Sequence, residues 1–167
     1  MKIKSGYTLM EMMLVVGIMG VLILAAPKTF IKTYQFVQLI TARVEIQKNA
    51  RGALANINRD LRQAVGTSVV VDSVPGQPPH SRITFNKYNS SGGQTAVSYY
   101  QEGNKLYQGV GGVTGKMIAN NLRYIAFTYP RTDDDGIISI SITFEKATYE
   151  GGTKALQMAV EKVRIMN

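Results

Sequence analysis

The sequence predicts an α+β protein, in which one long N-terminal helix packs on an antiparallel β-sheet domain. Apolar residues crowd the first 26 positions of a 167-residue chain that is 45% hydrophobic overall. The remainder is mixed and polar, with helical spacing of apolar residues up to position 65 and strand-like alternation after it. This division predicts one compact domain attached to an anchor rather than two full domains.

The anchor is the apolar segment near the N-terminus. Residues 1–6 form a short basic leader, and residues 7–26 follow with only Thr8 and Glu11 as polar interruptions. Twenty helical residues span about 30 Å, the hydrocarbon thickness of a bilayer. A secretory signal has its small-residue cleavage site after the apolar stretch. Here the small residue, Gly6, precedes that stretch, so cleavage after it would leave the anchor attached.

An amphipathic helix is expected to continue the anchor. Pro27 predicts a kink or local unwinding at the membrane boundary, because it lacks a backbone donor and clashes with the preceding turn. Gly66 lies where the helix is expected to stop, directly after Val65. The predicted stripe has one polar member, Gln47, and consists of Val37, Ile40, Val44, Gln47, Ala50, Leu54, Ile57, Leu61 and Ala64. We expect its residues Val44, Ala50, Leu54, Ile57 and Leu61 to pack against Ile140, Ile142 and Phe144.

Strand-like stretches fill the rest of the chain. The clearest one alternates isoleucine and phenylalanine with serine and threonine over residues 138–144. A hairpin is expected around Glu102-Gly103-Asn104. The predicted strands are Ser68–Asp72, 82–86, Ala96–Gln101, Lys105–Gln108, Leu122–Tyr129, 138–144 and Lys154–Met166. The predicted organisation is therefore leader 1–6, transmembrane helix 7–27, amphipathic helix 28–66 and β-sheet domain 67–167.

The positive charge is concentrated on the helix. The formal net charge is +8, and removing the two leader lysines leaves 17 basic and 11 acidic residues, or +6. Residues 28–66 have seven basic residues against Glu45 and Asp60, whereas residues 67–167 have ten against eight. Anionic lipid headgroups and acidic neighbouring subunits suit such a helix. The absence of cysteine excludes disulfides and thiolate metal sites.

A known processing site resembles the beginning of this chain. Gly6-Tyr7-Thr8-Leu9-Met10-Glu11, preceded by a basic leader and followed by an apolar run, resembles the cleavage site of type IV pilins and type II secretion pseudopilins. The family usually has phenylalanine at the position of Tyr7, and its proline usually lies one residue after the position of Pro27. The resemblance covers residues 1–30.

The resemblance implies a maturation pathway. A prepilin peptidase would cut between Gly6 and Tyr7 and methylate the new amine of Tyr7. The subunit would wait in the inner membrane, with its C-terminal domain in the periplasm or extracytoplasmic space, until an assembly platform moves it into a filament. Glu11 would neutralise the N-terminal amine of its own or a neighbouring subunit. Partners would be other pilin-type subunits, the peptidase, the platform and membrane lipid.

The physical chemistry of Glu11 supports this role independently. A carboxylate at the centre of a membrane-spanning helix costs about 2.5–3.5 kcal/mol by insertion scales, and less near an end. Glu11 lies one helical turn from Tyr7, about 6 Å along the axis, where a positive terminus and the helix dipole both favour an anion. An interfacial glutamate that merely reaches water is the alternative interpretation.

Shorter motifs resemble one subgroup of the family. The segment 58–64 at the helix end is similar to the W-type minor pilins and the J-type minor pseudopilins. So are Ile83-Thr84-Phe85, the hairpin segments 98–100 and 105–107, and Leu122–Tyr129. The resemblance implies a subunit at or near a filament tip that helps to initiate or cap assembly.

Other functions have weaker signals. Asp133, Asp134 and Asp135 could supply oxygen ligands for calcium, but adjacent aspartates are also typical of a solvated turn. His80 is the one histidine, and no catalytic signature accompanies it. No cofactor is expected, and the tyrosines follow strand alternation rather than a nucleic-acid-binding pattern. The hypothesis is a minor pilin or pseudopilin that is not an enzyme; a major filament subunit, a DNA-binding minor pilin and a membrane-anchored enzyme are the alternatives.

Overall fold

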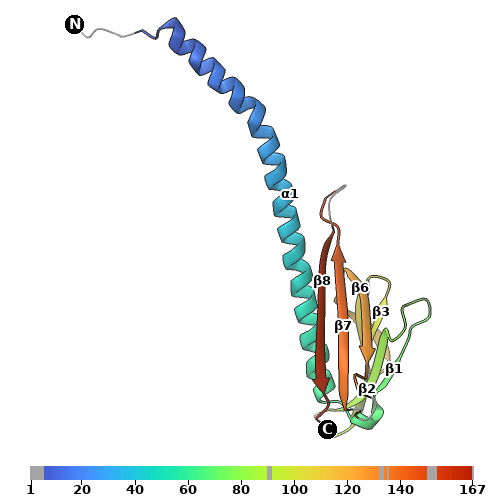
Figure 1. Cartoon of the computed structure of the whole chain (residues 1–167). Helices are drawn as coiled ribbons and strands as arrows, with labels where there is room; N and C mark the ends of the chain where they lie inside the picture. Colours follow the sequence, from blue (N-terminus) through green and yellow to red (C-terminus); the bar gives the residue numbers. More distant parts are fainter. Residues whose placement is uncertain (1–5, 90–91, 132–133, 135, 150–153, 167) are drawn as a thin grey trace.

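One long helix dominates the computed structural model, which describes residues 6–89, 92–131, 134, 136–149 and 154–166. Helix α1 (Leu9–Arg62) has 54 residues and is about 80 Å long at 1.5 Å per residue. Its C-terminal part lies along a β-sheet head, and its N-terminal part extends away from the head (Figure 1). The predicted α+β class, with one helix on antiparallel sheet structure, is confirmed.

The helix runs through Pro27 without interruption, so the expected local unwinding does not occur. Its axis curves along its length in Figure 1. A kink at Pro27 itself stays a prediction. The helix also ends earlier than Val65, because the chain beyond Arg62 pairs with a strand: the Val65 amide donates to the Asn86 carbonyl at 2.8 Å.

Two antiparallel sheets form the head, which comprises residues 66–166. A short 3₁₀ turn, Gly66–Ser68, leads into it. The five-stranded sheet follows chain order: β1 (Val70–Asp72), β2 (Arg82–Tyr88), β3 (Gln94–Glu102), β4 (Lys105–Val110) and β5 (Val113–Ala119). The three-stranded sheet also follows chain order: β6 (Leu122–Thr128), β7 (Ile137–Lys146) and β8 (Ala155–Arg164). The sequence predicted one sheet and missed β5.

The predicted hairpin is confirmed as the β3–β4 connection. Glu102 pairs with Lys105, and Gly103 between them has φ of 59°, a left-handed conformation that glycine adopts without strain. The strands predicted over residues 138–144 and 154–166 correspond to β7 and β8, which pair along their whole length from Ile137↔Arg164 to Lys146↔Ala155.

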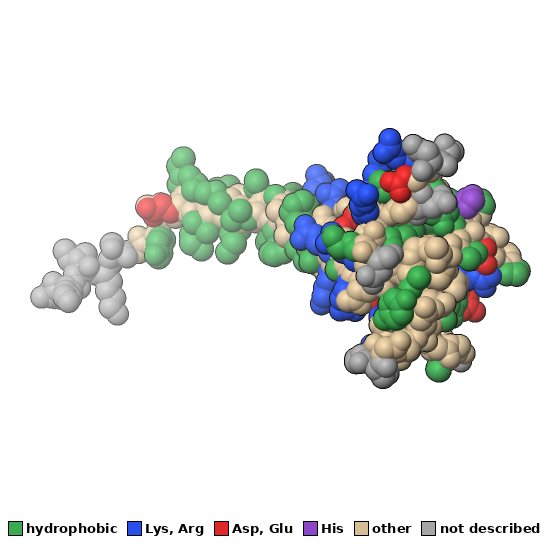
Figure 2. All heavy atoms as spheres, turned by 90° about the horizontal axis from the view of Figure 1, so that it is seen from below, with side chains coloured by type: hydrophobic (Ala, Val, Ile, Leu, Met, Phe, Trp, Pro, Cys, Tyr) green, Lys and Arg blue, Asp and Glu red, His purple; other side chains and the backbone are tan. Residues whose placement is uncertain are grey.

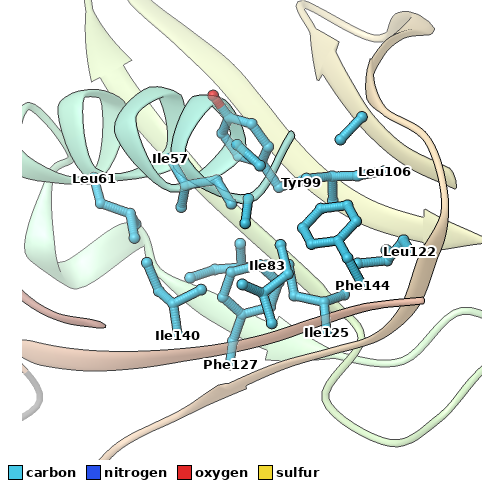
Figure 3. Packing of buried hydrophobic residues seen from close by; sticks show 14 of the residues in the cluster. Ile57, Leu61, Ile83, Tyr99, Leu106, Leu122, Ile125, Phe127, Ile140 and Phe144 are labelled. Atoms are coloured by element: carbon cyan, nitrogen blue, oxygen red, sulfur yellow. The ribbon is translucent and has the colours of Figure 1, made fainter. Parts of the chain in front are cut away.

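The core lies where the helix and the two sheets meet (Figure 3). Helix α1 packs against β8, β7 and β5. Ile57 and Leu61 of the helix join Ile83 and Tyr99 of the five-stranded sheet in one buried cluster. The three-stranded sheet contributes to the same cluster with Leu122, Ile125, Phe127, Ile138, Ile140, Ile142 and Phe144.

The predicted helix stripe is wrong in its first half. Val37, Ile40 and Val44 are exposed, Val44 by 58%, although we expected Val44 to pack on the sheet. The predicted series from position 37 to 64 advances about 3.4 residues per step, less than the 3.6 of a helical turn, so it drifts around the helix. The buried face stays on one side of the helix, because positions 42, 46, 50, 53, 57 and 60 average 3.6 residues per step. It consists of Ala42, Ile46, Ala50, Ala53, Ile57, Asp60 and Leu61.

Candidate functional site: the N-terminal segment and the exposed helix

The first residues of α1 are joined by a capping box. The Thr8 backbone amide donates to Glu11 Oε2 at 2.9 Å, and the Glu11 amide donates to Thr8 Oγ1 at 3.2 Å. Thr8 Oγ1 also donates to the same carboxylate oxygen at 3.1 Å. These bonds satisfy two backbone donors that the first helical turn would otherwise leave unpaired. Glu11 is therefore hydrogen-bonded to Thr8 and also lies one helical turn from Tyr7.

The two predicted cleavage residues, Gly6 and Tyr7, directly precede the N-cap residue Thr8 and are exposed. Gly6 is exposed, and a methyl group added at its Cα would meet no atom within 4 Å. Tyr7 is 86% exposed. Any requirement for glycine at position 6 therefore comes from an enzyme that binds the segment, and not from packing within this chain.

The helix beyond the cap is covered with exposed apolar side chains. Among the described residues, α1 is the one helix whose length and composition would allow it to cross a membrane, and its most apolar part is not buried at all. Figure 2 shows this projecting part coated with hydrophobic side chains. The large apolar side chains from Leu9 to Leu24 are all exposed, and none is buried by another described part of the chain. They are available to lipid or to other helices.

Apolar exposure continues beyond the length that a bilayer covers. Phe30 and Tyr34 are exposed, as are Val37, Ile40 and Val44 further along the helix. From Leu9 to Val44 the helix is about 50 Å long, against about 30 Å of bilayer hydrocarbon. Lipid alone therefore leaves part of this surface uncovered.

Comparison with known families identifies the segment just described. The family model of the prokaryotic N-terminal methylation motif matches residues 1–27. This chain carries the N-terminal methylation motif. The motif is the type IV pilin signature, and it indicates a type IV pilin or pseudopilin precursor. No curated protein and no solved structure matches the chain.

The methylation motif implies processing by a prepilin peptidase and assembly with other pilin subunits. Together with the exposed apolar helix it indicates a membrane-anchored protein. Proteins of this motif family are structural subunits, not enzymes.

Outside the methylation motif, a buried carboxylate joins the helix to the head. Asp60 is 1% exposed and accepts from the Tyr99 hydroxyl at 2.8 Å, Gln108 Nε2 at 2.7 Å and Lys87 Nζ at 3.0 Å. Burial, and then the hydrogen bond to this carboxylate, raise the pKa of Tyr99 above its usual value. The hydrophobic pattern of the sequence did not predict this network, although Asp60 lies three residues after Ile57 on the same helix face.

Further polar contacts fix the helix against the three-stranded sheet. Glu45 forms an ion pair with Lys146, and Asn58 donates to Glu161. Asn121 Nδ2 also donates to Glu45 Oε1 at 3.3 Å. These contacts tie the distal half of α1 to the head, while Glu11 lies 34 residues before Glu45 on the same 54-residue helix.

The weak calcium candidates are only partly described. Asp134 Oδ1 accepts from the Gly136 amide at 2.9 Å, the local bond of a turn between β6 and β7. Asp133 and Asp135 lie outside the described residues. Among the residues that the structure describes, no group of three His, Cys, Asp or Glu side chains is placed to hold a metal ion. His80 is exposed in the connection from β1 to β2.

Proposed function

We propose that this protein is a minor pilin or pseudopilin that a prepilin peptidase cuts after Gly6 and methylates on Tyr7. Residues 7–27 hold the mature subunit in the inner membrane, and the head lies outside the cytoplasm. The subunit then enters a pilus-like filament, in type II secretion or type IV pilus biogenesis, and helps to initiate or cap it. In the filament, helix α1 packs side by side with the N-terminal helices of other subunits.

One observation carries this proposal: the methylation motif begins a continuous helix whose apolar surface is longer than a bilayer is thick. A simple tether needs only about 20 apolar residues. The additional exposed residues, such as Phe30 and Val37, suit contacts with the helices of neighbouring subunits. Burial of apolar surface stabilises such contacts by roughly 25 cal/mol per Å².

The proposal predicts that Gly6→Phe blocks maturation. A Cβ added at position 6 meets no described atom within 4 Å and Gly6 is exposed, so the precursor should fold and insert normally. In cells with an active prepilin peptidase, the wild-type chain should lose its leader and migrate faster on a gel, and mass spectrometry should find methylated Tyr7 at its N-terminus. The variant should keep the migration of the precursor.

Ser5→Ala serves as the control, because it changes the leader without placing bulk at the cleavage position. It should be processed like the wild-type chain. A wild-type chain that keeps Met1 in the presence of active peptidase would contradict the proposal. Recovery of the processed chain as the most abundant subunit of sheared filaments would instead favour the major-subunit alternative.

A further inference from the structure

The face of α1 that points away from the sheets carries a continuous exposed stripe. This outer stripe consists of Val37, Ile40, Val44, Lys48, Arg51 and Ala55, all exposed. Its members are three or four positions apart, on average about one helical turn of 3.6 residues, so they share one face. Its first half is apolar and continuous with the anchor, and its second half is cationic.

The cations of the outer stripe have no counter-charge within the described part of the chain. Neither Lys48 nor Arg51 forms an ion pair there, and Figure 2 shows Lys and Arg side chains gathered where the helix meets the head. The nearby carboxylates are already engaged: Glu45 pairs with Lys146, and Asp60 pairs with Lys87. The positive charges of Lys48 and Arg51 are therefore available to pair with acidic groups of another molecule.

Lipid headgroups lie too far away to supply that acid. With the membrane boundary at Pro27, Lys48 is about 32 Å and Arg51 about 36 Å beyond it along the helix. The headgroup layer is only about 5–8 Å thick on each side of the bilayer. Lys28 and Lys32 are at the level of this layer and suit anionic lipid, whereas Lys48 and Arg51 lie beyond the reach of the headgroups.

A second copy of this chain offers a poor match. It would bring the same cations, and two of the five described carboxylates of its head are already paired, Asp72 with Arg82 and Glu145 with Arg123 and Lys154. The other three described carboxylates of the head, Glu102, Asp134 and Glu161, are scattered over β3, the β6–β7 connection and β8. They form no acidic face.

We propose that the outer stripe docks a pilin-type subunit of different sequence, whose helix covers Val37–Val44 and whose acidic surface pairs with Lys48 and Arg51. This inference rests on the proposed filament function and adds the chemistry of the partner to it. Complementary charge fixes which neighbour is accepted, because like charges brought together at an interface disfavour the wrong partner. The chain then occupies single positions beside acidic subunits instead of polymerising with itself.

The first test identifies what touches the stripe. The chain contains no cysteine, so Ala55→Cys gives one thiol for a benzophenone photo-crosslinker. In membranes from cells with the complete assembly machinery, the expected adduct is a different protein that carries the N-terminal methylation motif and is cross-linked through a segment rich in Asp and Glu. The matched control, Ala96→Cys on exposed β3, should not give this adduct. An adduct with a second copy of the chain, or with lipid, would overturn the inference.

The second test reverses the charge. In the Ala55→Cys background, Lys48→Glu/Arg51→Glu should reduce the adduct at least about tenfold, and changing the cross-linked carboxylates of the partner to lysine should restore it. Lys116→Glu/Lys162→Glu makes the same charge change at exposed head positions and should leave the adduct unchanged. Equal effects of the two pairs, or no rescue, would overturn the inference.

The same samples separate this inference from the proposed function. Leader removal and recovery in sheared filaments are read on the wild-type chain by immunoblot. A chain that is neither processed nor recovered in filaments contradicts the proposed function itself. A chain that is processed and recovered, but cross-links to its own copies, contradicts only the acidic partner.

Discussion

Asp60→Ala is expected to lower the free energy of unfolding of the head by about 2–4 kcal/mol, because it removes a buried acceptor on which several donors converge. The carboxylate accepts hydrogen bonds from Tyr99 and Gln108 and an ion pair from Lys87. Its loss leaves an ammonium group and two further polar groups with an unfilled space between them. The buried Tyr99 hydroxyl loses its acceptor, which adds a desolvation penalty, whereas Gln108 Nε2 keeps the Tyr99 oxygen at 2.8 Å and Lys87 is partly exposed to water.

The measurement is thermal unfolding of the full chain in detergent, followed by the near-ultraviolet signal of its tyrosines. A loss of this size should lower the transition by roughly 10 °C in a chain of 167 residues. Glu102→Ala, which removes an exposed carboxylate from β3, should change the transition by no more than about 2 °C. A shift at position 60 as small as that of the control would show that the network does not stabilise the head.

The Asp60 network also explains how the head is held in one orientation relative to helix α1. Only the distal part of α1 touches the sheets, and the network lies close to the end of the helix at Arg62. Apolar contacts of Ile57 and Leu61 alone are non-directional, whereas a carboxylate with three donors from β2, β3 and β4 permits one arrangement. The orientation of the head relative to the filament axis therefore depends on a charge that the hydrophobic pattern does not reveal.

Local sequence patterns predicted the helix and most strands well, but they did not predict which strands pair with each other. The turn residue Gly103 and the alternation along β7 are visible within a few positions, and both predictions were correct. Strand β5 was missed because its residues, among them Gly115 and Lys116, alternate poorly and pair only with β4. The division into two sheets depends on which strands find each other, and no short window of sequence contains that information.

The predicted apolar stripe of α1 shows how regular spacing of hydrophobic residues can lead to a wrong assignment of the buried helix face. Apolar residues lie on both faces of α1, since Val37 and Val44 are exposed while Ile46 and Ile57 enter the core. A series chosen for hydrophobicity crosses from one face to the other. Gln47, the polar member of the predicted stripe, marks the crossing, and it is exposed.

The residues of the candidate site are close together in the sequence, so the sequence alone predicted them as a group, and their individual roles stay predictions. Gly6, Tyr7 and Glu11 all fall within the methylation motif. The contribution of Thr8 was missed, although Thr8-Leu9-Met10-Glu11 has the spacing of a capping box. That spacing gives Glu11 two competing roles, a cap for its own helix and a counter-charge for an N-terminal amine.

Glu11→Gln is expected to leave leader removal intact and to reduce incorporation into filaments at least about tenfold. Glutamine can still accept from the Thr8 amide, as capping boxes with glutamine do, so the local cap is retained. What it lacks is the negative charge that would pair with the amine of Tyr7 in the mature protein or in a neighbour, within an apolar medium where an unpaired charge is costly. Glu11→Val removes both roles and should be at least as severe.

Thr8→Ala provides the converse variant. It deletes the hydroxyl that accepts from the Glu11 amide, at a cost of about 1 kcal/mol to the first turn, but keeps the carboxylate. Its incorporation should stay within about twofold of the wild-type chain, measured as the ratio of filament-bound to membrane-bound subunit. If Thr8→Ala fails to assemble while Glu11→Gln assembles normally, the Glu11 carboxylate serves to cap its own helix and is not needed for subunit assembly. The two variants thus separate a role that the fold makes visible from a role that only an assembled filament would use.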